Sequence, residues 1–458
     1  MKKLLLAGAL LLGAATPPAN AVDDGGTPPA PPPAGVFPYP HTIATLKNGL
    51  QVVMVPRRGS GLLAYYTLVR VGSRNEVEPG RSGYAHFFEH MMFRGTEKYP
   101  QDKYEDVIKR YGANNNAYTD DDLTVYTIFG RAEGLEKFVE IEADRFQNLK
   151  YSRAAYETEA KAILGEYNKS RSDPDEKMYE ELCNAAFTRH TYKHTTIGFE
   201  ADIRSMPQGY DYSLGFFRKY YSPDNTTVIL VGDFAPERAR ALIESAYGGW
   251  RGRAVEPKTA REPPQRAERK VELPWDRPAQ PKMMMGWHTP EATPRTARER
   301  AVASLLQELV FGSTSPLYQD LVLDKQISDE LDAWSPDRRE PHLFVVTASA
   351  RDPARLPEIL AAIDAELSRV AAHGVDEKRL AAVKSRERYA FLSSLERDSA
   401  VADTLANILG ITGNLQWLDQ QFTALDAVTN DDIKAFVARY LVPANRTLVT
   451  LRVPGEGE

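Results

Sequence analysis

The sequence predicts an α+β fold made of two similar domains, each a mostly antiparallel sheet covered by helices. The chain has 458 residues, which is more than one ordinary hydrophobic core accommodates. From about His41 onward, segments rich in Val, Leu and Tyr alternate with segments of helical character. A short set of residues near the end of one half also recurs near the end of the other, which indicates a duplication.

The recurrent set predicts a helix that leads through a turn into a strand. The first copy consists of Phe216, Tyr220, Pro223, Asn225 and Thr227, and the second of Phe436, Tyr440, Pro443, Asn445 and Thr447. Each residue of the second copy stands 220 positions after its counterpart, and a strand-like run follows in both halves. We interpret the two copies as one α/β unit that has been repeated.

The first half contains enough local signals to predict its elements in order. Strands are expected where β-branched and aromatic residues gather, at 50–57, 62–72, 116–129 and 225–234. Helices are expected at 83–93, 103–111, 132–149 and 152–171, the second of them stopped by Gly112.

The first 40 residues resemble an export signal followed by a tether. Lys2 and Lys3 precede an apolar stretch at 4–15, and Ala19-Asn20-Ala21 fits a cleavage site, so residues 1–21 are predicted to be a signal peptide cleaved after Ala21. An uncleaved anchor is the alternative, but the apolar stretch is short for a membrane span. Residues 22–40, rich in Pro and Gly, are predicted to be an extended linker.

The remaining chain is predicted to form two domains of ordinary size. A charged, Pro-containing segment at 251–272 is interpreted as an interdomain linker, which leaves a first domain at 41–250 and a second at 273–458. Cys183 is the only cysteine, so no internal disulfide is possible. A large exported protein with so little cysteine suits a bacterial periplasm.

Composition and net charge indicate which classes of binding partner to expect. Hydrophobic residues make up 42% of the chain and charged residues 26%, which is typical of a globular protein. The formal net charge of -6 gives no support for nucleic-acid binding, which usually needs a basic face. No other long uncharged apolar run occurs, so we expect no membrane span in the mature chain.

The clearest chemical signal is His86-Phe87-Phe88-Glu89-His90. Residues i and i+4 share one face of a helix, so the two imidazoles can bind one metal ion. Glu89 lies beside them, where its carboxylate can take a proton from water. The order H-x-x-E-H is a known zinc signature. The alternative, two core histidines and a chance Glu, is improbable because the chain has only eight histidines.

A catalytic zinc site normally has three protein ligands, so a third must come from elsewhere. The predicted helix at 152–171 carries Glu157, Glu159 and Glu166. Glu159 and Glu166 are seven residues apart and share a face, so one could bind the metal while the other orients a histidine. A solvated acidic face is an equally good interpretation of the pattern, which also does not choose between Glu159 and Glu166.

The residues 83–96 (GYAHFFEHMMFRGT), with Tyr99-Pro100 and the stretch 112–119 (GANNNAYT), resemble the pitrilysin/insulinase family of zinc peptidases. This family includes the mitochondrial processing peptidases and periplasmic bacterial relatives, and the resemblance covers nearly all of 41–458. It implies a clamshell of two related domains. A single zinc ion is expected, bound by the first domain. The resemblance also implies that Glu166 is the third ligand and that Glu159 supports the site.

The resemblance further implies a peptide-binding strand, which carries over to Asn116 and Ala117. An exposed strand edge can bind any peptide backbone by adding it as a new strand. A plain turn is the alternative for Asn114 to Asn116, and it is an equally good interpretation for Asn114 and Asn115.

Active family members often have an Arg and a Tyr in the second domain, in the pattern Leu-Arg-x-x-x-Gly-Leu-x-Tyr. The matching stretch here is 321–329 (LVLDKQISD), with Val322 and Asp329 at those places. We therefore expect a homologous partner subunit that supplies the Arg and the Tyr.

The resulting hypothesis is a periplasmic zinc endopeptidase that hydrolyses short unfolded peptides in a closed chamber, as the metal-bearing subunit of a two-subunit enzyme. The alternatives are a non-catalytic scaffold or core subunit of the same fold, and a zinc enzyme that matures one precursor. Two histidines and a carboxylate would also accept manganese or cobalt.

Overall fold

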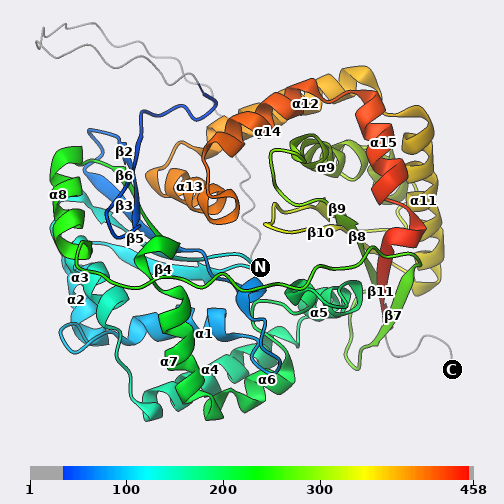
Figure 1. Ribbon diagram of the computed structural model, residues 1–458. Coiled ribbons are helices and arrows are strands. Elements are labelled where there is room, and N and C mark those ends of the chain that lie inside the picture. Colours follow the sequence, from blue (N-terminus) through cyan, green and yellow to red (C-terminus); the bar gives the residue numbers. More distant parts are fainter. Residues whose placement is uncertain (1–34, 453–458) are drawn as a thin grey trace, which may run out of the picture. The chain divides into compact units, whose positions relative to one another are not determined.

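Two β-sheets organise the chain, and they share the order of five strands, to which the first sheet adds β1 (Figure 1). The structure, a computed structural model, describes residues 35–452. The predicted signal peptide at 1–21 and most of the predicted linker at 22–40 lie outside the described residues. Within the described part, no helix is long and apolar enough to cross a membrane.

The first sheet has the strand order β1-β2-β6-β3-β5-β4 and the second the order β7-β11-β8-β10-β9. The strands of the first sheet are β1 (Thr42–Thr45), β2 (Gln51–Pro56), β3 (Leu62–Val69), β4 (Asn114–Thr119), β5 (Thr124–Arg131) and β6 (Thr226–Gly232). Those of the second are β7 (Arg269–Pro274), β8 (Lys282–Thr289), β9 (Leu331–Trp334), β10 (His342–Ser349) and β11 (Arg446–Arg452). Each sheet contains one parallel pair, β2–β6 and β7–β11, and the other pairs are antiparallel.

Helices pack on both sheets. Those before β7 are α1 (Tyr84–Met91), α2 (Gln101–Arg110), α3 (Leu135–Asn148), α4 (Arg153–Ser170), α5 (Pro174–Ala186), α6 (Glu200–Ser205), α7 (Tyr210–Tyr220) and α8 (Pro236–Tyr247). Those after it are α9 (Ala297–Val310), α10 (Pro316–Tyr318), α11 (Leu356–His373), α12 (Glu377–Ser394), α13 (Asp398–Thr412), α14 (Gln416–Ala427) and α15 (Asn430–Tyr440). The predicted α+β fold with two similar halves is confirmed.

The repeat predicted from the sequence has the same local structure in both halves. α7 leads through a 3-10 turn into β6, and α15 leads through an equivalent turn into β11. In the first copy the side-chain amide of Asn225 donates to the carbonyl of Tyr220 at 2.9 Å. In the second copy Asn445 donates to Tyr440 at 2.8 Å. The two asparagines recur because each satisfies a carbonyl at a helix C-terminus.

Each half also contributes a helix to the sheet of the other half. One face of the first sheet packs on α1, α3, α7 and α8, and the opposite face packs on α13 through Val401, Leu405 and Leu409. The second sheet is covered in the same way by α5, whose Met178 and Leu182 are buried against it. The predicted domains 41–250 and 273–458 therefore each have a core of their own, and two further buried clusters contain residues from both.

Two predicted segments differ from the structure. The range 116–129, predicted as one strand-like run, is a hairpin in which β4 and β5 are joined by a turn closed by Asp120 N–H to Leu123 O at 2.8 Å. Consecutive aspartates disfavour a strand and favour this turn. β7 begins at Arg269, inside the predicted linker 251–272, because pairing with β11 outweighs its charged composition.

Candidate metal centre

α1 presents its polar residues along one side and buries the other. Ala85, Phe87, Phe88 and Met91 are fully buried, and this apolar face holds the helix against the first sheet and α7. Gly83 precedes the helix with φ +90°, and a Cβ there would lie 2.5 Å from the carbonyl of Ile197. Only glycine satisfies both constraints.

Glu76, in the loop before α1, caps the N-terminus of this helix. Its carboxylate accepts the backbone N–H of Gly83 at 2.7 Å and that of Ala85 at 2.6 Å. Gly83 has no side chain with which to cap the helix, so Glu76 satisfies donors that the helix leaves unpaired. Burial raises the pKa of Glu76 well above its ordinary value, and the hydrogen bonds from the N–H groups of Ala85 and Gly83 only partly oppose this.

The side chains of His86, His90 and Glu166 converge. One ligand atom from each lies within 4.8 Å of the other two. Glu166 Oε2 is 3.7 Å from His86 Nε2 and 3.4 Å from His90 Nε2. Burial, reinforced by the neighbouring His90, lowers the pKa of His86 to about 4, so its imidazole is neutral at ordinary pH. A neutral imidazole is the form that binds a metal.

The separations fit zinc. Ligand atoms about 2.0–2.1 Å from a tetrahedral zinc stand roughly 3.3 Å from one another. The distances from Glu166 to the two imidazoles are close to this value, and two nitrogens with one carboxylate are a donor set that zinc accepts. The side chains of His86, His90 and Glu166 therefore form a donor set that would fit zinc.

Glu159 lies behind His90, on the side away from Glu166. His90 Nδ1–H donates to Glu159 Oε1 at 3.0 Å, and Arg94 Nε donates to Glu159 Oε2 at 2.7 Å. Burial works against the charge, but the hydrogen bonds from His90 and Arg94 lower the pKa of Glu159 below its ordinary value. A charged acceptor on Nδ1 directs Nε2 of His90 toward Glu166. Burial lowers the pKa of His90, but the hydrogen bonds with Glu159 and Glu166 outweigh it and raise that pKa to about 9, so a metal at Nε2 would displace a proton.

Glu89 has surroundings different from those of the other two acids. Its Oε2 accepts a hydrogen bond from the hydroxyl of Thr119 in β4 at 2.7 Å. Burial raises the pKa of Glu89 above its ordinary value, and the Thr119 contact only partly opposes this. A raised pKa makes a carboxylate a better proton acceptor near neutral pH.

A cleft of about 270 Å³ opens beside these side chains. It is lined by Glu89, His90, Phe93, Arg94, Gln101, Asn116 and Glu159. Asn116 belongs to β4, the edge strand of the first sheet, and no other strand in the described chain pairs with its outer side. Ala117 follows with its side chain buried. Asn114 and Asn115 begin the same strand, so the plain-turn interpretation is wrong for them.

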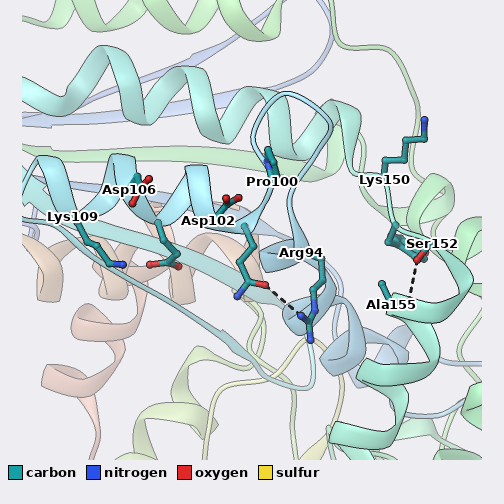
Figure 2. A pocket seen from close by; sticks show the side chains of 11 residues that line it. Arg94, Pro100, Asp102, Asp106, Lys109, Lys150, Ser152 and Ala155 are labelled. Carbon is teal, nitrogen blue, oxygen red and sulfur yellow. Dashed lines mark hydrogen bonds between the residues drawn. The ribbon is translucent and has the colours of Figure 1, made fainter.

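A second cleft, of about 680 Å³, adjoins the first (Figure 2). The two share Arg94 and Gln101, which are hydrogen-bonded at 3.3 Å. Asp102, Asp106 and Lys109 of α2 line one side in Figure 2, and Lys150 the other. The candidate site therefore adjoins a second open cleft, lined mainly by charged and polar side chains.

Sequence reasoning did not predict roles for Glu76, Arg94 or Thr119. Arg94 stands four residues after His90, so helical spacing could have placed it on the same face. Thr119 lies in the stretch that carries the family resemblance, but its contact with Glu89 depends on how β4 meets α1. Glu76 has no local signal, because it caps a helix that begins eight residues later.

Comparison with known proteins identifies the family. Residues 64–199 match the family model described as Insulinase (Peptidase family M16), and residues 210–387 match the one described as Peptidase M16 inactive domain. The chain belongs to the M16 family. Its metal motif lies in the part that matches the first of these models.

Similar members of the M16 family include zinc proteases. Zinc protease PqqE of Helicobacter pylori is 28% identical over 411 residues, which cover 86% of this chain and 90% of that protein. The crystal structure of a protease from Helicobacter pylori matches with a TM-score of 0.85 at 26% identity, over 90% of this chain and 99% of the other. The periplasmic protease PqqL of Escherichia coli shares the fold, with a TM-score of 0.74 at 19% identity, over 92% of this chain and 48% of that one.

Proposed function

We propose that this M16 protein is a zinc-dependent endopeptidase that hydrolyses short, unfolded peptides. The observation that carries the proposal is the convergence of His86, His90 and Glu166 within 4.8 Å, with Glu89 of the same helix beside them. The zinc proteases among its relatives support the same conclusion. A non-catalytic scaffold subunit has no requirement for all four side chains together.

The chain's own residues supply binding and proton transfer. His86, His90 and Glu166 would hold the ion, and Glu159 would orient His90 through Nδ1. When bound, zinc supplies Lewis-acid chemistry that polarises the scissile carbonyl and lowers the pKa of water. Glu89 accepts the proton of the attacking water and passes it to the leaving amine. Its raised pKa suits both transfers.

β4 is proposed to hold the substrate backbone. An extended peptide can pair with the outer edge of this strand at Asn116 and Ala117, which places its backbone beside Glu89. Such binding requires an extended segment, so folded proteins would be poor substrates. A chamber that closes around the peptide would strengthen this preference.

A homologous partner subunit is proposed to complete the site. Val322 packs against the core of the second half, and Asp329 pairs with Arg351 at 2.6 Å, so neither supplies an Arg or a Tyr. Gln326 supports the alignment that assigns these places. It occupies the glycine position of the family pattern and has φ +52°, the one non-glycine residue with positive φ in residues 35–452.

The periplasm is the proposed location. The predicted signal peptide 1–21 and the single cysteine support it, and so does the fold shared with a periplasmic protease. The match to PqqL also supports a partner subunit, because this chain covers only about half of the length of PqqL.

The test is hydrolysis of quenched fluorescent peptides of graded length by the mature chain, alone and with any co-expressed M16 protein. Glu89→Gln provides the matched inactive control, since it keeps the shape of the side chain and should keep the zinc. Activity lost in Glu89→Gln supports the peptidase, and activity only with the second protein supports the divided site. Zinc binding without hydrolysis in either arrangement would favour a scaffold subunit.

A further inference from the structure

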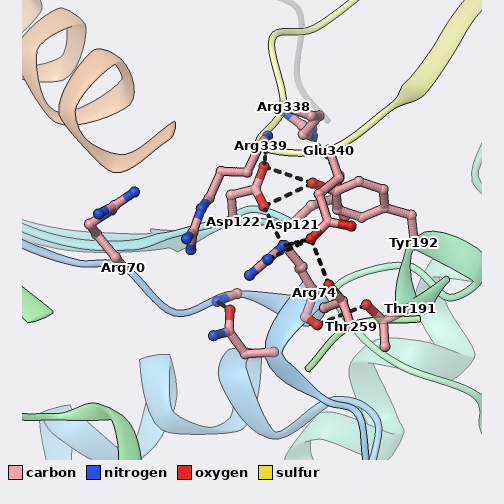
Figure 3. Close-up of polar contacts among 12 residues, drawn as sticks. Arg70, Arg74, Asp121, Asp122, Thr191, Tyr192, Thr259, Arg338, Arg339 and Glu340 are labelled. Carbon is pink, nitrogen blue, oxygen red and sulfur yellow. Dashed lines mark hydrogen bonds and ion pairs between the residues drawn. The ribbon is translucent and has the colours of Figure 1, made fainter. Parts of the chain in front are cut away.

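A short loop of the second half contacts two segments next to the candidate site (Figure 3). They are the turn between β4 and β5 and the short 3-10 helix that precedes Glu76. The loop consists of Arg338, Arg339 and Glu340 and lies between β9 and β10. We propose that these three residues position the catalytic helix α1 and Glu89 from the second half of the chain. The proposal rests on the peptidase function proposed above and adds positioning residues to it.

The first contact is with the turn between β4 and β5. Arg338 Nη2 donates to Asp120 at 2.7 Å, and Arg338 Nε donates to Asp121 at 2.8 Å. The backbone N–H of Arg339 donates to Asp122 at 2.9 Å. Asp121 and Asp122 are buried, as is most of the Arg338 side chain. One guanidinium thus ties two adjacent carboxylates to the second half.

This turn directly follows the residue that contacts the proposed base. Thr119 is the last residue of β4, and its hydroxyl donates to Glu89 at 2.7 Å. A displacement of the turn would move Thr119, because the two are adjacent in the chain. The turn therefore links Arg338 to the position of Glu89.

The second contact is with the short 3-10 helix η1 (Ser73–Asn75). Glu340 accepts from Arg74 Nε at 2.9 Å and from Arg74 Nη2 at 2.5 Å. Glu340 is itself held by the ring of His190 and the hydroxyl of Thr259, each at 2.6 Å. Figure 3 shows Glu340 directed toward Arg74. The carboxylate is therefore fixed from three sides.

η1 leads directly to the cap of the catalytic helix. Glu76 follows η1, and its carboxylate binds the N–H groups of Gly83 and Ala85 at the start of α1. η1 and the β4–β5 turn are also joined to each other, since Ser73 Oγ donates to Asp121 at 3.0 Å. Both routes from the loop thus end at α1.

The burial of these charges makes the arrangement specific. A buried carboxylate or guanidinium that loses its partner is left without compensation, so alternative positions of the turn and of η1 are disfavoured. Residues that only stabilise the fold, without positioning α1, could be buried in the same way. Arg446 offers the comparison, because it is a buried arginine whose carboxylate partners, Glu268 at 2.7 Å and Asp364 at 2.5 Å, both lie outside the candidate site.

The experiment compares Arg338→Lys and Glu340→Gln with Arg446→Lys as the matched control. Lysine keeps the charge but cannot form two parallel hydrogen bonds. Steady-state hydrolysis of a fluorescent peptide gives kcat and KM, and hydrogen exchange gives the protection of the amides at 83–91. We expect about a tenfold or greater loss of kcat, a KM within about twofold, and faster exchange at 83–91 in the first two variants only.

A double variant tests the route. If Arg338 acts through Thr119, then Arg338→Lys with Thr119→Val loses no more kcat than the worse single variant, whereas multiplied losses would overturn that route. Unchanged kcat and exchange in both Arg338→Lys and Glu340→Gln would overturn the whole proposal. If the wild-type chain hydrolyses nothing, either alone or with a co-expressed M16 protein, but exchange at 83–91 still responds, the positioning stands and the peptidase proposal fails. Glu340→Gln, the milder change, serves if Arg338→Lys does not fold.

Discussion

The hydroxyl of Thr119 lies 2.7 Å from Oε2 of Glu89, to which it donates a hydrogen bond. The contact joins the edge strand β4 to the helix α1, two elements that come from separate parts of the chain. β4 is the strand proposed to hold the peptide, and Glu89 is the group proposed to take the proton. The contact therefore sets the position of the base relative to the substrate.

Replacing Thr119 by valine should lower kcat by about tenfold while the zinc content stays unchanged, because the base loses its orienting donor and the metal ligands remain in place. Peptide hydrolysis and metal analysis on the same sample measure the two quantities. Thr158→Val is the control, since that hydroxyl only bonds to the carbonyl of Ala154 within α4. Equal kcat values in the two variants would show that Thr119 does not orient Glu89.

Glu159→Gln should weaken zinc binding by about 10- to 100-fold, because His90 loses the charged acceptor that fixes its ring. The measurement is competition against a chelator of known zinc affinity. Glu157→Gln on the same helix is the control, and its zinc affinity should match that of the wild type. If both variants bind zinc like the wild type, Glu159 has no role in the metal centre.

A half-buried acid between α13 and the first sheet should make stability depend on pH. The hydroxyl of Tyr66 donates to Asp403 at 3.5 Å, and burial raises the pKa of Asp403 from 3.8 to about 6. Because the folded-state pKa is the higher one, the stability associated with the protonated carboxyl is complete below pH 3.8 and is lost as the pH rises through about 6.

Asparagine cannot ionise, so Asp403→Asn should not lose this stability. The free energy of unfolding of the variant minus that of the wild type should therefore rise by about 1–3 kcal/mol when the pH is raised from 5 to 8. Urea unfolding at the two pH values measures this difference. Asp431→Asn, whose side chain is 88% exposed, is the control and should show no such change. A variant-to-wild-type difference that is the same at both pH values would contradict the assignment.

The exchange of helices between the halves predicts that α13 stabilises the first sheet. Leu405→Ala removes a fully buried side chain that packs on β3 and β6, and should cost about 2–5 kcal/mol. Leu392→Ala, in α12, where the residue is 41% exposed, should cost less than about 0.5 kcal/mol. Hydrogen exchange at β3 should accelerate in the first variant only, and unchanged protection of β3 would argue against the coupling.

Sequence patterns predicted those features that depend on residues close together in the chain. The spacing of His86 and His90 predicted that both lie on one helical face. The spacing of Glu159 and Glu166 predicted only a shared face and left a solvated surface as an equal alternative, whereas in the structure both acids lie beside His90. The recurrence of Asn225 at Asn445 predicted the repeated turn before a central strand. Each of these depends on neighbours within one or two helical turns.

The features that sequence reasoning missed depend on tertiary packing. The exchange of α5 and α13 leaves no trace in periodicity, because an apolar helical face does not state which sheet it covers. The cap provided by Glu76 depends on how the loop before α1 folds back, and the ion pair of Arg338 with Asp121 joins residues 217 positions apart. Charged residues of this kind look like a solvated surface until the structure shows their burial.

The account depends most directly on the metal centre formed by His86, His90 and Glu166. Crystals of the mature chain grown without added metal, with anomalous diffraction recorded on both sides of the zinc absorption edge, would test it. We predict one peak that appears only above the edge, within about 2.0–2.2 Å of His86 Nε2, His90 Nε2 and a carboxylate oxygen of Glu166. A zinc peak held by other residues, or no zinc in crystals soaked with the ion, would contradict the account.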